Sequence, residues 1–348
     1  MIPCAMFAQS NLVGTAPENC SVLIEHFTGI NVGEGVLGYD ALIAQYTADP
    51  QRVSAICYHF GGFADPVGNQ PDFRTAVGDT IGNYCSVQQV PRGVIGRRPF
   101  PNQFAIPYGD YGPAVNTTKN LPSPVNLGMA SSWDAANRTL SVDVEIYYTA
   151  DGTGGNDHIS VALVENNVIA EQVDFFDPTG IDTAYAHPWL FREQLTTAWG
   201  DEVTNNSMGH NETRTYTLNN VSMDYDINNC VVVAYISEFQ NDVYQAKHVP
   251  ADGGTTQVGI SENELDRVLG HAFPSPASDQ LTIPFRNLSE DAFVRIMDAT
   301  GRIVLQENVN KGSANMQLDV SSWSAGLYSY SLISESGQAS ATRIVQIQ

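Results

Sequence analysis

Residues Leu23–Gly35 read LIEHFTGINVGEG, an apolar segment that runs through a Thr-Gly turn into the start of a helical pattern. Working outward from it, the spacing of apolar residues predicts strands over 21–27 and 52–60 and helices over 35–48 and 72–84. A strand, helix, strand, helix order implies that the two strands pair in parallel through a right-handed crossover. The N-terminal part of the chain is therefore predicted to be an α/β domain.

The charge of the chain narrows its range of partners. Among 348 residues, 38 are acidic and 16 are basic, which gives a net charge of -22. A surface of this sign repels nucleic acid and anionic lipid, so we expect no nucleic-acid partner. The sequence also lacks an apolar run of about 18 residues, so we expect a protein that is not membrane-spanning.

Shifts in composition predict three domains. Residues 10–112 form the α/β domain, and residues 113–127, which are rich in Pro, Asn and Thr, form a linker. Residues 128–250 alternate apolar and polar side chains, which predicts an all-β sandwich. A second linker over 251–268 leads to a small antiparallel sandwich over 269–348.

Three shorter segments carry further expectations. Residues 1–9 look like the residual end of a secretory signal peptide, although the charged and apolar parts that should precede it are missing. Residues 187–203 break the alternation of the β domain and predict either a helical turn across a sheet end or a long structured loop. Asp298–Gly301 predicts a hairpin turn in which Gly301 adopts a positive φ.

Residues 269–348 contain several short motifs in order. These are Phe273–Ala277, Met297–Asp298 with Thr300–Arg302, Leu318–Ser321 and Ala325–Tyr328. On these motifs the region resembles the type A C-terminal sorting domain of proteins exported by the type IX secretion system of Bacteroidota, with Ser275 where that family has asparagine. The resemblance implies an Ig-like fold, an interaction of residues 269–348 with the type IX secretion machinery, and a secreted, cell-surface or outer-membrane-associated protein.

The preceding residues resemble the Omp28-related outer membrane protein family. The residues that carry this resemblance are Leu23–Glu25, Phe27–Gly29, Val90–Gly93 with Arg97, Leu163–Glu165, His187, Leu190, Arg192, Trp199 and Gly200. The resemblance implies a thioredoxin-like domain joined to a β domain. The predicted fold class is thus an α/β thioredoxin-like N-terminal domain, an all-β sandwich domain and a small Ig-like β-sandwich C-terminal domain.

The thioredoxin-like resemblance raises a chemical difficulty. Thiol-disulfide exchange needs a thiolate at a helix N-terminus and a second thiol to resolve the mixed disulfide. The corresponding positions here are Val32 and Gly35, so the expected Cys-x-x-Cys pair is absent. Pro91 matches the proline that faces such a pair, commonly in the cis form, although a trans proline that begins a strand is the alternative. We therefore expect a redox-inactive domain and a protein that is not an enzyme.

The cysteines leave two readings open. Apart from Cys4 in the signal-like segment, the chain has Cys20, Cys57, Cys85 and Cys230, which allow three complete pairings. An exported protein could oxidise them to disulfides. Cys57 and Cys230 lie in apolar runs, however, where free buried thiols are equally ordinary.

Other polar residues suggest a pocket and weak metal sites. His26 and His59 end the two predicted parallel strands, and with Glu34 they could line a ligand pocket. Oxygen ligands for calcium could come from two loops, through Asp151, Asp157, Asp224 and Asp226, but turn formation explains the same residues. We expect no cofactor, with calcium as the alternative.

The leading hypothesis is an exported, non-enzymatic protein that binds or assembles with other components at the cell surface, either proteins or glycans. One alternative is a structural subunit of a surface filament or outer-membrane complex, which would expose a sheet edge or an apolar patch. Another is a solute-binding protein or enzyme that reuses the emptied cleft.

Overall fold

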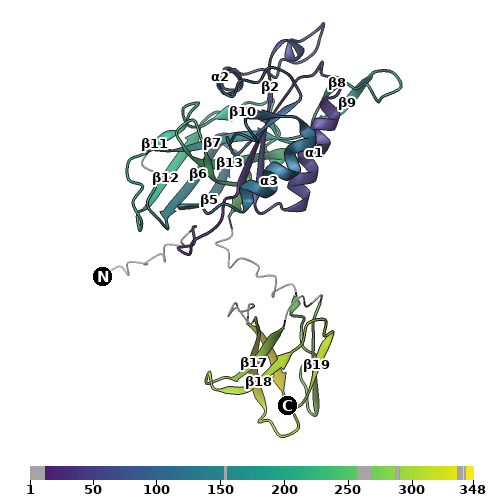
Figure 1. Ribbon diagram of the computed structural model, residues 1–348, viewed down its shortest axis with the longest axis vertical. Helices are drawn as coiled ribbons and strands as arrows, with labels where there is room; N and C mark the ends of the chain where they lie inside the picture. Colours follow the sequence, from purple (N-terminus) through teal and green to yellow (C-terminus); the bar gives the residue numbers. More distant parts are fainter. Residues whose placement is uncertain are drawn as a thin grey trace. The chain divides into compact units, whose positions relative to one another are not determined.

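The computed structural model divides the chain into two compact units, Met1–Val258 and Gly259–Gln348 (Figure 1). It describes residues 12–152, 155–256, 268–286, 288, 291–334, 340 and 342–348. The signal-like segment 1–9 therefore lies outside the described residues.

The first unit is built on a nine-stranded mixed sheet. Its strands are β1 (Val22–Thr28), β2 (Val53–His59), β3 (Arg92–Ile95), β4 (Ala105–Ile106), β7 (Asp157–Glu165), β10 (Leu190–Gln194), β11 (Asp201–Val203), β13 (Cys230–Glu238) and β14 (Val243–Pro250). Neighbouring strands follow the order β14-β13-β7-β10-β2-β1-β3-β4, and β11 pairs with β7. As predicted, β1 and β2 are parallel, with Val22 opposite Val53.

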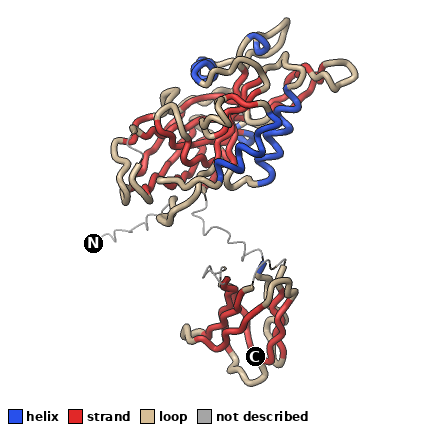
Figure 2. Tube along the Cα trace, in the orientation of Figure 1, coloured by secondary structure: helices blue, strands red, loops and turns tan. Residues whose placement is uncertain are grey.

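Helices lie on both faces of strands β1 and β2. The helices are α1 (Gly35–Ala48), α2 (Ala76–Tyr84) and α3 (Tyr111–Lys119), with short 3-10 turns η1 (Gly62–Ala64), η2 (Tyr108–Asp110) and η3 (Ile227–Asn229). Helices α1 and α3 pack on the face that carries His26, and α2 packs on the opposite face, against Phe27 and Tyr58. Figure 2 shows α1 and α3 side by side against the strands. His26 of β1 contacts both helices, because its ring centroid lies 5.2 Å from that of Tyr39 in α1 and 6.1 Å from that of Tyr111 in α3.

A second sheet packs on the part of the first sheet formed by β7, β13 and β14. Its strands, in the order β12-β6-β5-β15, are β12 (Asn211–Leu218), β6 (Thr139–Tyr148), β5 (Val125–Asp134) and β15 (Gly253–Thr255). Strand β7 is buried on both faces: Val161 and Leu163 belong to the core between the two sheets, and Ala162 and Val164 belong to the core around β1 and β2. A separate two-stranded sheet consists of β8 (Val168–Val173) and β9 (Ile181–His187).

The predicted linker over 113–127 is wrong. Residues 113–119 belong to helix α3, and residues 125–127 belong to β5. The Thr117 and Thr118 hydroxyls donate to the carbonyls of Pro113 and Ala114, four residues earlier, so these residues satisfy their polar groups inside the helix. A composition typical of loops is therefore compatible with a helix here.

The first sheet also runs across the predicted boundary between the domains over 10–112 and 128–250. Strand β10 pairs in parallel with β2 on one side and antiparallel with β7 on the other, which joins the two regions through one ladder. Segment 187–203, expected to be a helical turn or a loop, supplies this strand and β11. Backbone pairing with distant strands, which local pattern does not reveal, determines its conformation.

The second unit is a β sandwich of a two-stranded and a four-stranded sheet. The strands are β16 (Gln280–Pro284) with β19 (Asn315–Asp319), and, in the order β18-β17-β20-β21, β18 (Ile303–Val309), β17 (Ala292–Asp298), β20 (Gly326–Ser334) and β21 (Arg343–Ile347). The turn that joins β17 to β18 has Gly301 at φ 83°, as the sequence predicts. The Asp298 carboxylate accepts hydrogen bonds from the Thr300 and Arg302 N–H groups in this turn.

A fully buried ion pair lies under the first sheet. Glu25 of β1 accepts two hydrogen bonds of 2.8 Å from the Arg97 guanidinium, and neither side chain is exposed. Arg97 also donates to the Tyr235 hydroxyl of β13 at 2.8 Å, and its guanidinium carbon lies 5.3 Å from the centre of the Trp199 ring. The pair therefore holds together strands that are not neighbours in the sheet.

We expect Glu25→Gln to lower the free energy of unfolding of the first unit by about 3–5 kcal/mol, because it leaves the buried Arg97 charge unpaired. Calorimetric melting of the full chain measures this change. Replacement of both partners, Glu25→Leu with Arg97→Met, should cost less than the single change. The matched control is Lys119→Gln, which breaks the partly exposed pair with Asp49 and should cost at most about 1 kcal/mol. A single variant as stable as the wild type would contradict this account.

Candidate functional site

The two positions that align with a redox pair lie between β1 and α1. Val32 is buried in the connecting loop, and Gly35 is the buried first residue of α1. Neither side chain can attack or resolve a disulfide. A Cβ added at Gly35 would lie only 3.0 Å from Nε2 of Gln172 and 3.2 Å from the Thr28 hydroxyl, so the site has little room for a cysteine.

The β8–β9 hairpin covers this loop. The N–H of Val173 donates to the carbonyl of Ile30 at 2.9 Å, and the N–H of Phe175 donates to the carbonyl of Gly33 at 3.0 Å. The buried Gln172 amide donates to the carbonyl of Val32 at 2.9 Å. The ring of Phe175 lies so close to Gly33 that a Cβ there would be 2.3 Å from it. The face on which a redox pair would meet its substrate is thus occupied by another part of the chain.

Pro91 lies against the first turn of α1. The Val90–Pro91 peptide bond is cis, and a Cβ added at Gly38 of α1 would lie 2.9 Å from the Pro91 Cβ. The candidate cis-proline therefore packs on α1 about one turn after Gly35, beside His26.

Three buried histidines meet under the start of α1. The Tyr39 hydroxyl lies 3.3 Å from Nε2 of His59 and 3.3 Å from Nδ1 of His187. The rings of His59 and His187 are 5.5 Å apart, and Nδ1 of His26 is 2.8 Å from the Tyr111 hydroxyl. Of these histidines, His187 comes from the β8–β9 hairpin, so the cluster joins the hairpin to the core beneath the loop.

Burial keeps these histidines neutral. Desolvation lowers the pKa of His26 to about 3 and that of His187 to about 4. The pKa of His59 is also well below its usual value, first because of burial and then because His187 is close. Neutral, packed imidazoles of this kind stabilise the core and offer no charged group to a ligand.

The predicted pocket of His26, Glu34 and His59 is not assembled. The two histidines are buried, whereas Glu34 lies exposed at the N-cap of α1. No described hydrogen bond or ion pair joins Glu34 to either histidine. The aromatic rings of Tyr39 and Tyr111 occupy the position where a cleft was expected, because a strand end without reactive thiols can be packed like any other core.

The disulfide prediction is not supported by the structure. Cys20, Cys57, Cys85 and Cys230 are all free and buried. Burial raises the pKa of the Cys85 and Cys230 thiols to about 12 and that of Cys57 well above its usual value. Cys57 and Cys230 pack in different cores, which separates them. Such thiols are protonated at neutral pH and are poor nucleophiles.

The calcium candidates act as local hydrogen-bond acceptors. Asp151 accepts from the Met208 N–H, and Asp226 accepts from the Asn228 N–H at the start of η3. Asp157 is buried and accepts from the Tyr148 hydroxyl at 2.8 Å, and Asp224 is exposed. Within the part of the chain that the structure describes, no three His, Cys, Asp or Glu residues are grouped so as to hold a metal ion.

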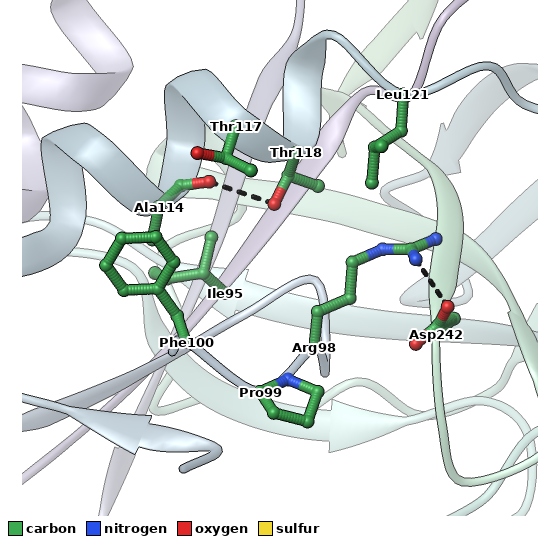
Figure 3. Close-up of a pocket in the computed structure, with 9 residues that line it drawn as sticks. All are labelled: Ile95, Arg98, Pro99, Phe100, Ala114, Thr117, Thr118, Leu121 and Asp242. Carbon is green, nitrogen blue, oxygen red and sulfur yellow. Dashed lines mark hydrogen bonds and ion pairs between the residues drawn. The ribbon is translucent and has the colours of Figure 1, made fainter. Parts of the chain in front are cut away.

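A pocket of about 290 Å³ lies where β3 ends, beside its last residue, Ile95 (Figure 3). Its lining residues are Ile95, Arg98, Pro99, Phe100, Ala114, Thr117, Thr118, Leu121 and Asp242. Its polar groups are mostly paired already: Arg98 forms an ion pair with Asp242, and both threonine hydroxyls donate to helix carbonyls. No sequence motif pointed to this pocket, because its lining comes from segments that are distant in sequence.

A second, largely buried ion pair joins β7 and β10. Arg192 of β10 donates to Glu165 of β7 at 2.8 Å, and its guanidinium carbon lies 4.8 Å from the centre of the Tyr225 ring. Glu25, Arg97, Glu165 and Arg192 therefore serve the core. Arg92, the remaining charged residue of the motifs in the first unit, is half-buried and donates to the Gln89 side chain at 2.8 Å.

The motif residues thus assemble into one fold, and comparison with protein families agrees with it. The model of the outer membrane protein Omp28 family matches residues 79–252, half of the chain. The chain belongs to the Omp28 family. The secretion system C-terminal sorting domain matches residues 271–347, which correspond to the second compact unit.

The chain is similar to solved structures at low identity. HBP35 of Porphyromonas gingivalis is 13% identical, with 95% of this chain and 98% of that chain covered and a TM-score of 0.50. A domain of the outer membrane lipoprotein Omp28 from P. gingivalis is 16% identical over 37% of this chain and 89% of that chain, with a TM-score of 0.26. A search of curated proteins finds no match.

These findings place the protein outside the cytoplasm. The sorting domain directs it to the type IX secretion system, and the Omp28 family is an outer membrane family. The protein is therefore secreted or located at the cell surface or outer membrane, as its motifs predict. None of the helices that the structure describes is long and apolar enough to cross a membrane.

The buried histidines predict how stability depends on pH. In the unfolded chain they take up protons below about pH 6.5, whereas in the fold His26 and His187 do so only near 3 to 4. Stability is therefore complete above pH 6.5 and falls as the pH drops, by on the order of 2 kcal/mol per histidine at pH 5. Denaturant unfolding at pH 7 and pH 5 measures this, and His26→Gln should reduce the difference. Equal stability at both pH values would contradict it.

Proposed function

We propose that this Omp28-family member is a non-enzymatic binding or assembly protein of the cell surface, with a redox-inactive thioredoxin-like region delivered by its sorting domain. The observation that carries the proposal is the combination of Val32 and Gly35 at the redox positions with a hairpin hydrogen-bonded over them. The parallel β1–β2 pair, its crossover helix α1 and the adjacent Pro91 support the thioredoxin-like part.

The chemistry of the remaining thiols supports the same proposal. Thiol-disulfide exchange needs an accessible thiolate, usually activated at a helix N-terminus. Cys57 lies inside β2, and Cys85 follows the last residue of α2, where the helix dipole disfavours a thiolate. Both are buried, so neither meets this requirement.

An exchange assay tests the absence of redox chemistry. We expect the purified full chain, with Cys4→Ser to remove the thiol outside the described residues, to reduce insulin no faster than buffer. We also expect Cys20, Cys57, Cys85 and Cys230 to react with a thiol reagent only after denaturation. A rate of insulin reduction that is lost in Cys57→Ser or Cys85→Ser would overturn the proposal.

Coupling on intact cells tests the binding role. A carbodiimide joins carboxylates to amines, which suits a chain with 38 acidic residues and few lysines. We expect discrete covalent adducts of the protein with neighbouring surface components. When cells are disrupted in high salt before the carbodiimide is added, these adducts should not form. Recovery of the protein from intact cells without any adduct would contradict a binding or assembly role.

A further inference from the structure

The β8–β9 hairpin, which covers the loop between β1 and α1, has an unpaired edge. Strand β9 pairs with β8 on one side and, within the described part of the chain, with no strand on the other. Ile181, Thr183, Ala184 and Ala186 are exposed along it. Its sequence, IDTAYAH, has neither the lysine nor the proline that commonly protects a sheet edge. The Ala184 N–H already donates to the Asp182 carboxylate. The other backbone groups along this edge are the ones with which another strand can pair.

Large apolar side chains are exposed on the same hairpin. Phe175 and Phe176, in the turn between the strands, are 71% and 63% exposed, and Ile169 of β8 is 63% exposed. Phe175 is held in place from below, because its ring lies against Gly33. In Figure 1 the hairpin projects at the end of the first unit near the start of α1. Exposed apolar groups on a braced element are typical of an interaction surface.

The charge of the hairpin indicates the chemistry of the partner. Residues 168–187 contain four acidic residues and no lysine or arginine, namely Glu171, Asp174, Asp177 and Asp182. No ion pair described for the chain includes any of the four. The exposed apolar groups therefore stand in a negative field, which favours a cationic partner and attracts it from a distance.

We propose that the β8–β9 hairpin is the docking site for an extended, lysine- or arginine-bearing segment of another protein, which adds as a strand to the free edge of β9 and packs apolar side chains on Phe175 and Phe176. This inference rests on the proposed binding function and names the surface that performs it. A second copy of the chain is a poorer occupant, because two molecules of net charge -22 would bring their acidic hairpins together.

Peptide binding to the full chain tests the chemistry. The probe is a fluorescently labelled octapeptide of alternating lysine and valine. Its binding to the protein is measured by fluorescence anisotropy. One control replaces lysine with glutamate, and the other methylates alternate backbone nitrogens to remove edge hydrogen bonds. We expect saturable binding of the probe, about tenfold or more tighter than that of either control, and weaker at high ionic strength. Equal binding of the methylated peptide would overturn strand addition.

Variants and hydrogen exchange locate the site. The double variant Phe175→Ser with Phe176→Ser should weaken probe binding by about tenfold or more, because it removes both aromatic rings on which the valine side chains of the probe would pack. Met223→Ser, at a side chain that is 80% exposed in another loop, is the matched control and should change nothing. Bound probe should slow amide exchange in Ile181–His187. Unchanged affinity of the double variant, or no protection of β9, would overturn the proposal.

Three further outcomes distinguish failure of this inference from failure of the proposed function. If sedimentation shows a dimer that Phe175→Ser with Phe176→Ser dissociates, the occupant is a second copy and the proposal of a cationic partner fails. If the probe does not bind but carbodiimide adducts persist on cells in the double variant, the inference fails while the binding function stands. Cysteine-dependent insulin reduction would instead remove the proposed function itself.

Discussion

The buried pair of Glu25 and Arg97 is the constraint around which the first unit is arranged. A carboxylate in the middle of an apolar strand is tolerated only when its hydrogen bonds are completed inside the protein. Arg97 supplies two of them from beyond β3, and Tyr235 of β13 and the Trp199 ring complete the surroundings of the guanidinium. The pair thereby links the N-terminal strands to strands that come more than a hundred residues later.

That arrangement explains why the loop between β1 and α1 is covered. Once β10 joins β2 to β7, the preceding hairpin has to lie over the end of β1, where Gln172 and Val173 bond to the loop. His187 then enters the cluster with His59 and Tyr39. The environment of the loop is that of a core. The hairpin above it keeps its aromatic turn and the free edge of β9 exposed.

Several features followed from local pattern. The helix over 35–48 and the parallel strands beside it were predictable, because the apolar spacing is strong and the connection is short. The sorting domain was recognisable from ordered motifs such as the Asp298–Gly301 turn, whose conformation depends on neighbours in sequence. The linker over 113–127 was mistaken because threonine hydroxyls can bond within a helix as well as within a loop.

The amino-acid sequence was thus sufficient for the family, the route of export, the missing thiols and the first strand-helix-strand unit, since each depends on residue identity or on spacing within a few turns of chain. The pairing of Glu25 with Arg97, the single sheet shared by two predicted domains, the histidine cluster and the covering hairpin required the folded chain. They join residues 72 to more than 140 positions apart, and no local periodicity encodes which distant groups satisfy one another.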